Sequence, residues 1–401
     1  MNKVDKQYLN LLQDILDNGV EKDTRAGRVK SVFGRQLRFN LKEGLPLLTT
    51  KKVFTKGVIH ELLWFLQRPY NSHGSMNIEY LVRNGVHIWD DDAYRWFKTN
   101  IANTIKPKQY MICLDEDDSY MFNTIRGIVN YEYWIENENK INDQNWLQNI
   151  TKEEFLDLTL QKVEIWQDFG ERYRFGDLGP IYGAQWRHFG DTSIDQIYNV
   201  IKTLKENPND RRMLCVAYNP AKLEDMALPP CHVMFQFYTR ELTPYERIRE
   251  FRKRCDTSDC IEEYEKIINP WTSRKDKEEM INKLDEIGIP KYGLSCMYTM
   301  RSNDEFLGQP YNTPSYAILT CMIAKLVNMI PDELIASLGD CHIYEAHFDA
   351  VKEQLSRKGS DNIPKLIIHG TQETIEDFKY EDFEIIGYSP DPPIKAPLLV
   401  G

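Results

Sequence analysis

The stretch ALPPCHVMFQFY, residues 227–238, decides how the rest of the sequence is interpreted. Cys231 follows two prolines and precedes a run of apolar and aromatic residues that is typical of a buried strand. A lone cysteine on such a strand is most often a small core residue. It acts as a nucleophile only as the thiolate, and because a free thiol has a pKa of about 8.5, nearby cations are needed to activate it. Both interpretations stay open on this stretch alone.

Other apolar runs indicate an α+β fold around this strand. Residues 211–220 (RRMLCVAYNP) and 292–303 (YGLSCMYTMRSN) have the pattern of buried strands. Residues 315–330 (SYAILTCMIAKLVNMI) are apolar over a length that favours a helix. The alternation in 31–41 (SVFGRQLRFNL) predicts a pair of strands around Gly34.

Two further helices are expected in the N-terminal part of the chain. Residues 6–18 have an amphipathic pattern that ends at Gly19. Residues 54–67 (FTKGVIHELLWFLQ) are strongly apolar and carry a single carboxylate, Glu61. Burying a carboxylate is costly unless it has partners or a chemical task, so Glu61 either tips out of the apolar face or belongs to a functional site.

Two charged blocks interrupt the apolar runs. Residues 97–172 are rich in Asn, Asp, Glu, Lys and Trp, and Thr151 is placed to cap a short helix. Residues 240–292 predict two or three solvated helices. We therefore expect a single catalytic domain over 1–401 that carries two inserted lobes, at 97–172 and 240–292.

Composition limits the class of protein. The chain has 401 residues, 42% of them apolar, and a net charge of −11, which argues against general affinity for nucleic acid or anionic membranes. No apolar run reaches the roughly 18 residues of a membrane span, and the N-terminus lacks the pattern of a signal peptide. The eight cysteines form no metal-type pairs, so a cytoplasmic protein without a metal site is expected.

Four arginines near these runs are candidates for activating the thiol or for binding a phosphate. They are Arg25 in DTRAG, Arg211 and Arg212 in NDRRM, and Arg301 in MRSND. A guanidinium binds a phosphate through two parallel hydrogen bonds. A lone arginine is usually solvated, so only their joint arrangement with Cys231 and Glu61 is informative.

The joint arrangement resembles the thymidylate synthase family. The matching stretches occur in the family's order and cover nearly all of the chain outside the two charged blocks; they include LPLLTTKKVFTKGVIHELLWFLQ, GDLGPIYGAQWRHFG, NDRRMLCVAYNP, MALPPCHVMFQFY, RSNDEFLGQPYN and SLGDCHIYEAHFDAVKEQL. The resemblance implies a three-layer core in which a large mixed β-sheet forms the interface of a homodimer.

The resemblance also implies a role for each matching residue. Catalytic roles fall to Cys231, Glu61, Tyr182 and Asn312. Nucleotide contacts fall to Arg25, Arg301, Ser302, His342 and Tyr344, and, from the partner subunit, to Arg211 and Arg212. Folate contacts fall to Trp89, Asp304 and Gly308, and the tail 394–401 (IKAPLLVG) would close the site.

The implied reaction is the transfer of one carbon from 5,10-methylenetetrahydrofolate to C5 of dUMP. Addition of the Cys231 sulfur to C6 makes C5 an enolate carbon and therefore a good nucleophile. The C5 proton must then leave, which requires a base and ordered water. Asn312 offers a donor and an acceptor that match uracil, whereas an aspartate there would favour cytosine.

Several positions depart from the family's synthase pattern, and they lie mainly on the expected folate side. They are Met300, Tyr218, Tyr311 and Asp92, together with the phosphate loop DTRAGRVK, the long loop 68–77 and the extra terminal Gly401. After the transfer, the base carries an exocyclic methylene that either hydride or water can attack. More polar groups near this methylene would admit a water, so these departures favour a deoxyuridylate hydroxymethylase of the bacteriophage type. Thymidylate synthase is the alternative, and an inactive nucleotide-binding regulatory homologue is the alternative from another class.

Overall fold

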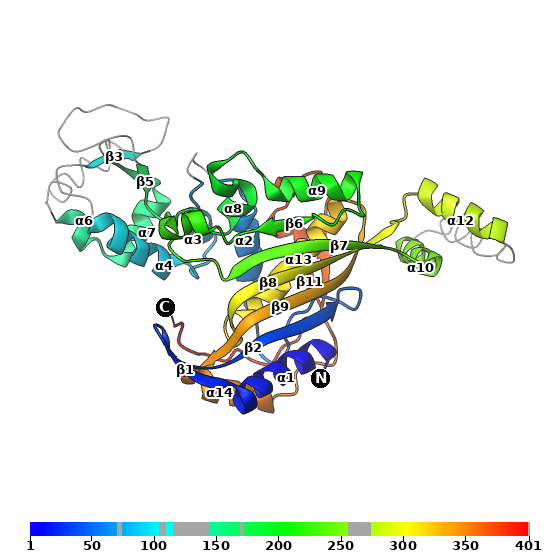
Figure 1. The fold of residues 1–401 in the computed structure, drawn as a ribbon, viewed down its shortest axis with the longest axis horizontal. Helices are drawn as coiled ribbons and strands as arrows, with labels where there is room; N and C mark the ends of the chain where they lie inside the picture. The colour runs from blue at the N-terminus through cyan, green and yellow to red at the C-terminus, as the bar shows by residue number, and fades with distance from the viewer. Residues whose placement is uncertain (70–73, 104–109, 115–144, 168–171, 256–273, 400–401) are drawn as a thin grey trace.

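The centre of the molecule is a six-stranded mixed β-sheet. The computed structural model describes residues 1–69, 74–103, 110–114, 145–167, 172–255 and 274–399. The strand order is β1-β2-β9-β8-β7-β6 (Figure 1). β8 and β9 run parallel, and the other neighbours are antiparallel. The bounds are β1 Val20–Thr24, β2 Gly27–Asn40, β6 Leu214–Val216, β7 His232–Glu241, β8 Tyr292–Asp304 and β9 Ile330–Tyr344.

Two apolar helices pack behind this sheet, as the sequence predicts. α13 (Gln309–Leu326) lies against β8 and β9, and α2 (Thr55–Phe65) packs on α13. An outer layer of short elements then covers these two helices: α3 (Glu79–Arg83), η5 (Ile375–Asp377) and η6 (Tyr380–Asp382). Among the described residues, no helix combines the length and apolar character needed to cross a bilayer.

The remaining core elements close the ends of the sheet. α1 (Lys3–Asn18) begins at the Asn2 cap, ends at Gly19 and packs on β2. The others are α8 (Gly183–Arg187), η2 (Phe189–Asp191), α9 (Gln196–Glu206), η3 (Pro220–Asp225), η4 (Glu345–His347), α14 (Phe348–Ser356), β10 (Lys365–Ile368) and β11 (Phe383–Ile386).

The strand pair expected around Gly34 is wrong. Residues 27–40 form one continuous strand, β2, whose register against β9 is the same on both sides of Gly34. Gly34 has a φ of 73°, which a glycine tolerates without interrupting the ladder. The hairpin turn lies instead at residues 24–27, between β1 and β2, where Gly27 has a φ of 125°.

The first charged block contains more strand than the sequence predicts. Its helical elements are η1 (Phe97–Ala102), α6 (Trp146–Asn149) and α7 (Lys152–Leu160), and α4 (Asp90–Trp96) directly precedes the block. Thr151 caps α7 as predicted, because its Oγ1 accepts the backbone N–H of Glu154 at 3.2 Å. The missed element is an antiparallel sheet of β3 (Tyr110–Leu114), β4 (Val163–Gln167) and β5 (Arg172–Arg174). β3 pairs with β4 across a long interval of sequence, which local patterns do not reveal, whereas β4 and β5 are close in the chain.

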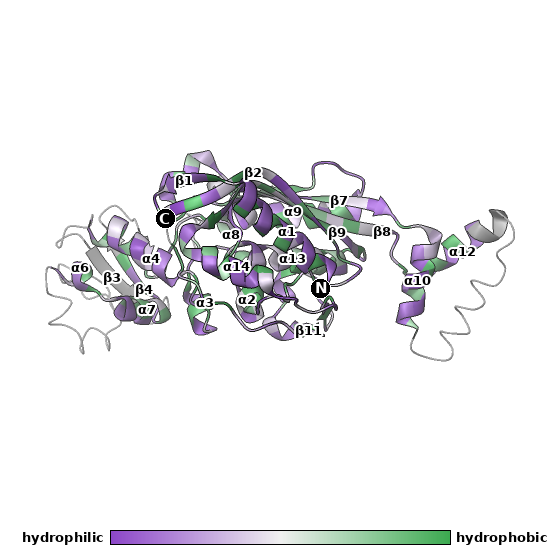
Figure 2. Ribbon diagram, turned by 90° about the horizontal axis from the view of Figure 1, so that it is seen from below, coloured by the Kyte–Doolittle hydropathy of each residue, from purple (hydrophilic) through white to green (hydrophobic). Residues whose placement is uncertain are grey.

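The second charged block contains the predicted helices α10 (Pro244–Arg254) and α12 (Arg274–Glu286), and residues 256–273 lie outside the described part. The helices α10 and α12 and the residues next to them share a small apolar cluster, made of Ile248, Phe251, Cys255, Met280, Leu284 and Ile289. α10 is mostly hydrophilic, and the two blocks extend to opposite sides of the central layers (Figure 2). That they are insertions stays a prediction.

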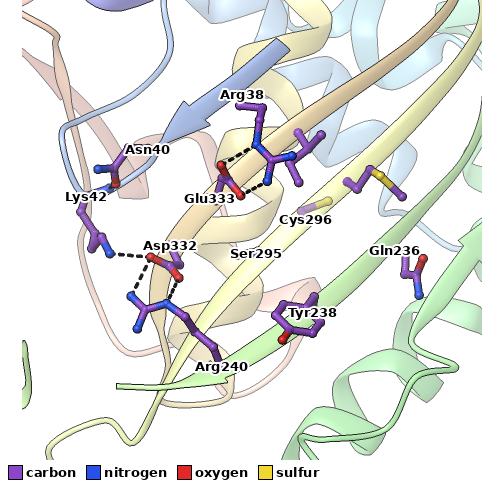
Figure 3. Close-up of a pocket in the computed structure, with 12 residues that line it drawn as sticks. Arg38, Asn40, Lys42, Gln236, Tyr238, Arg240, Ser295, Cys296, Asp332 and Glu333 are labelled. Atoms are coloured by element: carbon purple, nitrogen blue, oxygen red, sulfur yellow. Dashed lines mark hydrogen bonds and ion pairs between the residues drawn. The ribbon is translucent and has the colours of Figure 1, made fainter. Parts of the chain in front are cut away.

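The sheet face opposite α13 carries exposed side chains. Along β7, Phe235 and Phe237 are buried, whereas Tyr238 is 67% exposed, as expected for alternating faces. This face holds a hollow of about 560 Å³ that is lined by paired charges (Figure 3). Arg38 pairs with Glu333, and Lys42 and Arg240 both pair with Asp332.

Candidate active site

Cys231 lies immediately before β7, where its backbone is held on both sides. Its N–H donates to Tyr182 Oη at 3.0 Å, and its carbonyl accepts the N–H of Arg301 at 2.9 Å. The Arg301 guanidinium donates to the carbonyls of Pro229 and Pro230, at 2.8 Å each. The two prolines and Arg301 therefore fix the position from which the thiol projects.

The thiol of Cys231 is the favoured form in this chain. Burial raises its pKa, and the positive charge of Arg301 and a hydrogen bond with Tyr182 oppose that rise without reversing it. Partly buried thiols with a single cation nearby need further help to ionise. The sulfur is therefore placed for attack, and its ionisation depends on groups that join the site with the substrate.

Glu61, the single carboxylate of α2, has a partner from another element. Trp89 Nε1 donates to Glu61 Oε1 at 2.7 Å. Burial raises the pKa of Glu61 to about 7, and the bond from Trp89 opposes this rise. A carboxyl group that titrates near neutral pH is suited to accept and return a proton. Glu61 is partly exposed, and the hydrogen bond from Trp89 holds its carboxyl group; its place in a functional site stays a prediction.

Tyr182 lies between Cys231 and the Glu61–Trp89 pair. Its ring centroid is 5.8 Å from that of Trp89 and 5.1 Å from that of Phe65. Its φ of 25° is unusual for a residue other than glycine, and strain of this kind is concentrated at functional sites. Burial raises the pKa of Tyr182, so its hydroxyl stays protonated and its oxygen accepts the Cys231 N–H.

Asn312 lies in the first turn of α13. Its backbone N–H donates to Gly308 O at 3.0 Å, and its side-chain Nδ2 donates to Asn303 Oδ1 at 3.0 Å. Gly308 precedes α13, and a Cβ there would lie 2.9 Å from the carbonyl oxygen of Asp304. Asp304 Oδ1 accepts the N–H groups of Phe306 and Leu307, so one of its oxygens holds the turn that leads into α13.

The parallel pair β8–β9 brings three more predicted residues into this region. Ser302 pairs with Asp340, and Asp304 pairs with His342. His342 Nδ1 lies 3.3 Å from Asp340 Oδ1. The His342 and Tyr344 rings are perpendicular with centroids 5.1 Å apart, as expected for residues two apart on one strand face. The pKa of Tyr344 is raised by burial and then by Asp304 and Cys231, so this phenol lies within electrostatic range of the thiol.

Three predicted arginines lie apart from Cys231 in the described chain. Arg25 belongs to the turn between β1 and β2. Arg211 and Arg212 precede β6 and are exposed, and Arg212 pairs with Asp210 at 2.9 Å. The contact of Arg211 and Arg212 with the nucleotide phosphate bound to the partner subunit stays a prediction.

The structure adds site residues that sequence reasoning missed. Lys51 is 4% exposed, contacts the Phe306 carbonyl, and lies 3.5 Å from the centroid of the Phe306 ring. Burial lowers its pKa to about 7, and the negative charge of Asp304 opposes this. Glu305 is fully buried beside Asn303, and burial raises its pKa to about 8. Lys51 follows an apolar and hydroxyl-rich run, which was an available signal, whereas Glu305 stands among other charged and polar residues and had none.

Comparison with known proteins agrees with this geometry. A sequence model described as thymidylate synthase matches residues 6–251 and 277–400. The chain is 35% identical to the thymidylate synthase of Coxiella burnetii over 399 residues, and 34% identical to that of Mycoplasma mobile over 397 residues. The thymidylate synthase of Listeria monocytogenes is 35% identical over 400 residues. Each alignment covers 98% of this chain and 100% of the relative.

The chain belongs to the thymidylate synthase family. It is therefore a one-carbon transferase of a family that uses methylenetetrahydrofolate as co-substrate, binds dUMP and folate, and is typically dimeric. The matched ranges include the first charged block, and the unmatched residues 252–276 lie within the second.

The departures from the thymidylate synthase pattern have protein partners. Met300 is 2% exposed and packs in the core. Asp92 is paired with Arg95. Burial raises the pKa of the Tyr311 hydroxyl, a hydrogen bond from the Phe54 backbone opposes this, and Glu61 adds to the rise. Met300, Asp92 and Tyr311 are therefore packed or paired within the protein, and Tyr218 is partly exposed.

The C-terminal segment is held at two points. Arg357 contacts the carbonyl of Pro392, and His347 Nε2 lies 2.8 Å from the carbonyl oxygen of Pro397, which is within the tail. The extra residue Gly401 lies outside the described residues.

Proposed function

We propose that this chain transfers the one-carbon unit of 5,10-methylenetetrahydrofolate to C5 of dUMP through a transient bond between Cys231 Sγ and C6. The observation that carries the proposal is the order of groups along the site. The nucleophile Cys231 contacts Tyr182, and Tyr182 packs on Trp89, which donates to Glu61. The Cys231 sulfur and the titratable carboxyl group of Glu61 are thus connected through the aromatic side chains of Tyr182 and Trp89.

The chemistry follows from these residues. As the Sγ–C6 bond forms, the electron pair of the C5–C6 double bond moves onto C5 and the O4 enolate. Opening of the five-membered ring of methylenetetrahydrofolate breaks one C–N bond of the methylene carbon and gives an iminium ion, and C5 bonds to that carbon as the C=N electron pair returns to nitrogen. The C5 proton then passes to a general base, for which Tyr182 and Glu61 are the candidates. Cleavage of the second C–N bond detaches tetrahydrofolate and leaves an exocyclic methylene on the pyrimidine; hydride from tetrahydrofolate to this methylene gives dihydrofolate and expels the Cys231 thiolate from C6 as dTMP forms. A neutral phenol that accepts from Cys231 and a carboxyl group with a pKa of about 7 suit a proton relay through ordered water.

The nucleotide contacts follow from charge and position. Arg301 and Ser302 would hold the 5′-phosphate together with Arg25, and His342 and Tyr344 would hold the sugar 3′-hydroxyl. Arg211 and Arg212 of the partner subunit would complete the phosphate site in a homodimer. The exposed, charge-paired sheet face in Figure 3 is the surface that we assign to that interface.

The folate contacts are assigned to the side of the site that holds Glu61. Trp89 would offer its ring, while Asp304 and Gly308 shape the turn before α13. The buried ammonium of Lys51 beside Phe306 supplies a cation in the same turn. The tail from Ile394 onward would close over the bound co-substrate.

Of the two products, we propose dTMP with dihydrofolate. The relatives at 34–35% identity are thymidylate synthases by name, and the hydroxymethylase expectation finds no support among them. Met300 is apolar and buried, and the Asp92 carboxylate is neutralised by Arg95, so neither needs a water. A dry site favours hydride transfer to the exocyclic methylene over attack by water.

One assay separates the two products. Enzyme, dUMP and methylenetetrahydrofolate are expected to give the absorbance rise of dihydrofolate together with a product whose mass equals dTMP. A product that carries an extra oxygen, with no dihydrofolate, would instead establish the hydroxymethylase. A reaction with neither product and no covalent adduct at Cys231 would favour the inactive regulatory homologue.

Base selection gives a second prediction. Asn312→Asp is expected to shift the ratio of kcat/KM for dUMP over dCMP by about tenfold or more toward dCMP, because a protonated carboxyl matches the cytosine edge. The measurement is competition between the two nucleotides. Unchanged selectivity would remove Asn312 from base recognition.

A further inference from the structure

The side chain of Asn312 is an ambiguous reader of a pyrimidine. The uracil edge offers an acceptor at O4 and a donor at N3, and cytosine offers the reverse. A primary amide presents one donor and one acceptor, and rotation by half a turn exchanges them. Asn312 therefore distinguishes the two bases only where the protein fixes the orientation of its amide.

Asn303, on β8, contacts the amide of Asn312 directly. Asn312 Nδ2 donates to Asn303 Oδ1 at 3.0 Å. Asn303 Nδ2 in turn donates to Glu305 Oε1 at 2.8 Å and to Gln309 Oε1 at 2.9 Å. Both amide hydrogens of Asn303 are thus used, and its oxygen is left facing Asn312.

Gln309 has its own polar partner one step further from the site. Tyr298 Oη lies 3.2 Å from Gln309 Nε2, 3.4 Å from Gln309 Oε1 and 2.9 Å from Thr313 Oγ1. Glu305 Oε1 accepts from Asn303 Nδ2, so a proton that Glu305 retains because of its raised pKa belongs on Oε2. The donors and acceptors are therefore consistent from Glu305 and Gln309 through Asn303 to Asn312.

Burial makes a reversal of this direction costly. Asn303 is 2% exposed, Gln309 is 1% exposed, and Glu305 and Tyr298 are fully buried. Reversing the amide of Asn303 would set its oxygen against the oxygens of Glu305 and Gln309 and its N–H group against that of Asn312. A buried polar group left unpaired costs about 1–3 kcal/mol, so several such groups outweigh a single base contact.

His232 is a neighbour of the Asn312 side chain. His232 Nδ1 lies 2.9 Å from Tyr316 Oη, and burial lowers the pKa of His232 to about 4 while the Asn312 side chain opposes this shift. With one N–H donated to Asn303, Asn312 keeps its second N–H and its amide oxygen for a ligand. That pair matches O4 and N3–H of uracil.

We propose that Asn303 is a positioning residue that selects uracil over cytosine by fixing the amide of Asn312, and that Glu305 and Gln309 hold Asn303 in the required orientation. The inference deepens the proposed function, because it rests on Asn312 as the residue that reads the base. It assigns base selection to a buried cluster that the nucleotide does not touch.

The test compares Asn303→Ala with Gln309→Leu and the control Thr313→Val. The quantity measured is the preference for dUMP over dCMP, both as the ratio of kcat/KM values and as the ratio of binding constants from calorimetry. Asn303→Ala is expected to lower this preference at least tenfold, because Asn312 becomes free to rotate. Gln309→Leu is expected to lower it less, since Glu305 still holds Asn303. Thr313→Val keeps every bond to Asn312 and should leave the preference within twofold.

The outcomes separate this inference from the proposed function. If wild type turns over dUMP and Asn303→Ala keeps a preference within tenfold of wild type, the positioning role is overturned and the function stands. If wild type forms no product but binds dUMP in preference to dCMP, and Asn303→Ala loses that preference, the function fails and the positioning role stands. Should Asn303→Ala not fold, the same criteria apply to Gln309→Leu with a threshold of threefold.

Discussion

Cys231→Ala is expected to abolish turnover, with a loss of kcat of about 10⁴-fold or more, while dUMP binds within about tenfold of wild type. The substitution removes only the sulfur. The contacts that hold this residue use its main chain, namely the N–H that donates to Tyr182 and the carbonyl that accepts from Arg301, and alanine retains both. Steady-state kinetics and calorimetry measure the two quantities.

Cys255→Ala is the matched control for this variant. Cys255 is also a thiol that packs among apolar side chains. It belongs to the small cluster beside α10, far from the start of β7 at His232. It should keep full activity. Mass spectrometry under denaturing conditions is expected to detect a dUMP–folate adduct on wild type and on Cys255→Ala only. Turnover by Cys231→Ala within tenfold of wild type would rule out the covalent route.

Glu61→Gln is expected to lower kcat by about 10²–10⁴-fold with a smaller change in KM for dUMP. Glutamine has nearly the shape of glutamate and can still accept the hydrogen bond from Trp89, but it does not exchange a proton. The loss should therefore appear in the chemical step. Exchange of the C5 proton with solvent is the direct measurement, and an unchanged exchange rate would exclude Glu61 from the relay.

The same substitution is expected to stabilise the fold increasingly as pH rises. Burial raises the pKa of Glu61 from 4.5 to about 7, so between these values the folded protein holds a proton that the unfolded chain has released. The free energy of unfolding of wild type therefore falls across this window, and glutamine has no such loss. The Tm difference between Glu61→Gln and wild type should be larger at pH 8 than at pH 4. Glu373→Gln, at an exposed position, is the control and should show no such difference.

Much of the framework was predictable from local patterns. Alternating apolar residues gave the strands around Cys231, and apolar periodicity with caps gave α1, α2 and α13. The capping signal at Thr151 was also correct. These features depend on residues a few positions apart, whose spacing determines which side chains share a face. The sheet β3-β4-β5 was missed because β3, at residues 110–114, pairs with β4, at residues 163–167, far later in the sequence. The hairpin at residues 24–27 was missed although its strands are adjacent, because the alternation pattern placed the turn at Gly34 in place of Gly27.

The sequence by itself determined the family, the position of Cys231 before an apolar strand, and the presence of one carboxylate on α2. Only the tertiary structure decided that Trp89 is the partner of Glu61, that Tyr182 accepts from Cys231, and that Asn303 holds Asn312. The physical reason is that hydrogen-bond direction and desolvation arise between segments brought together by packing. A buried amide or carboxyl group acquires its orientation and its pKa from those neighbours, and no local pattern encodes them.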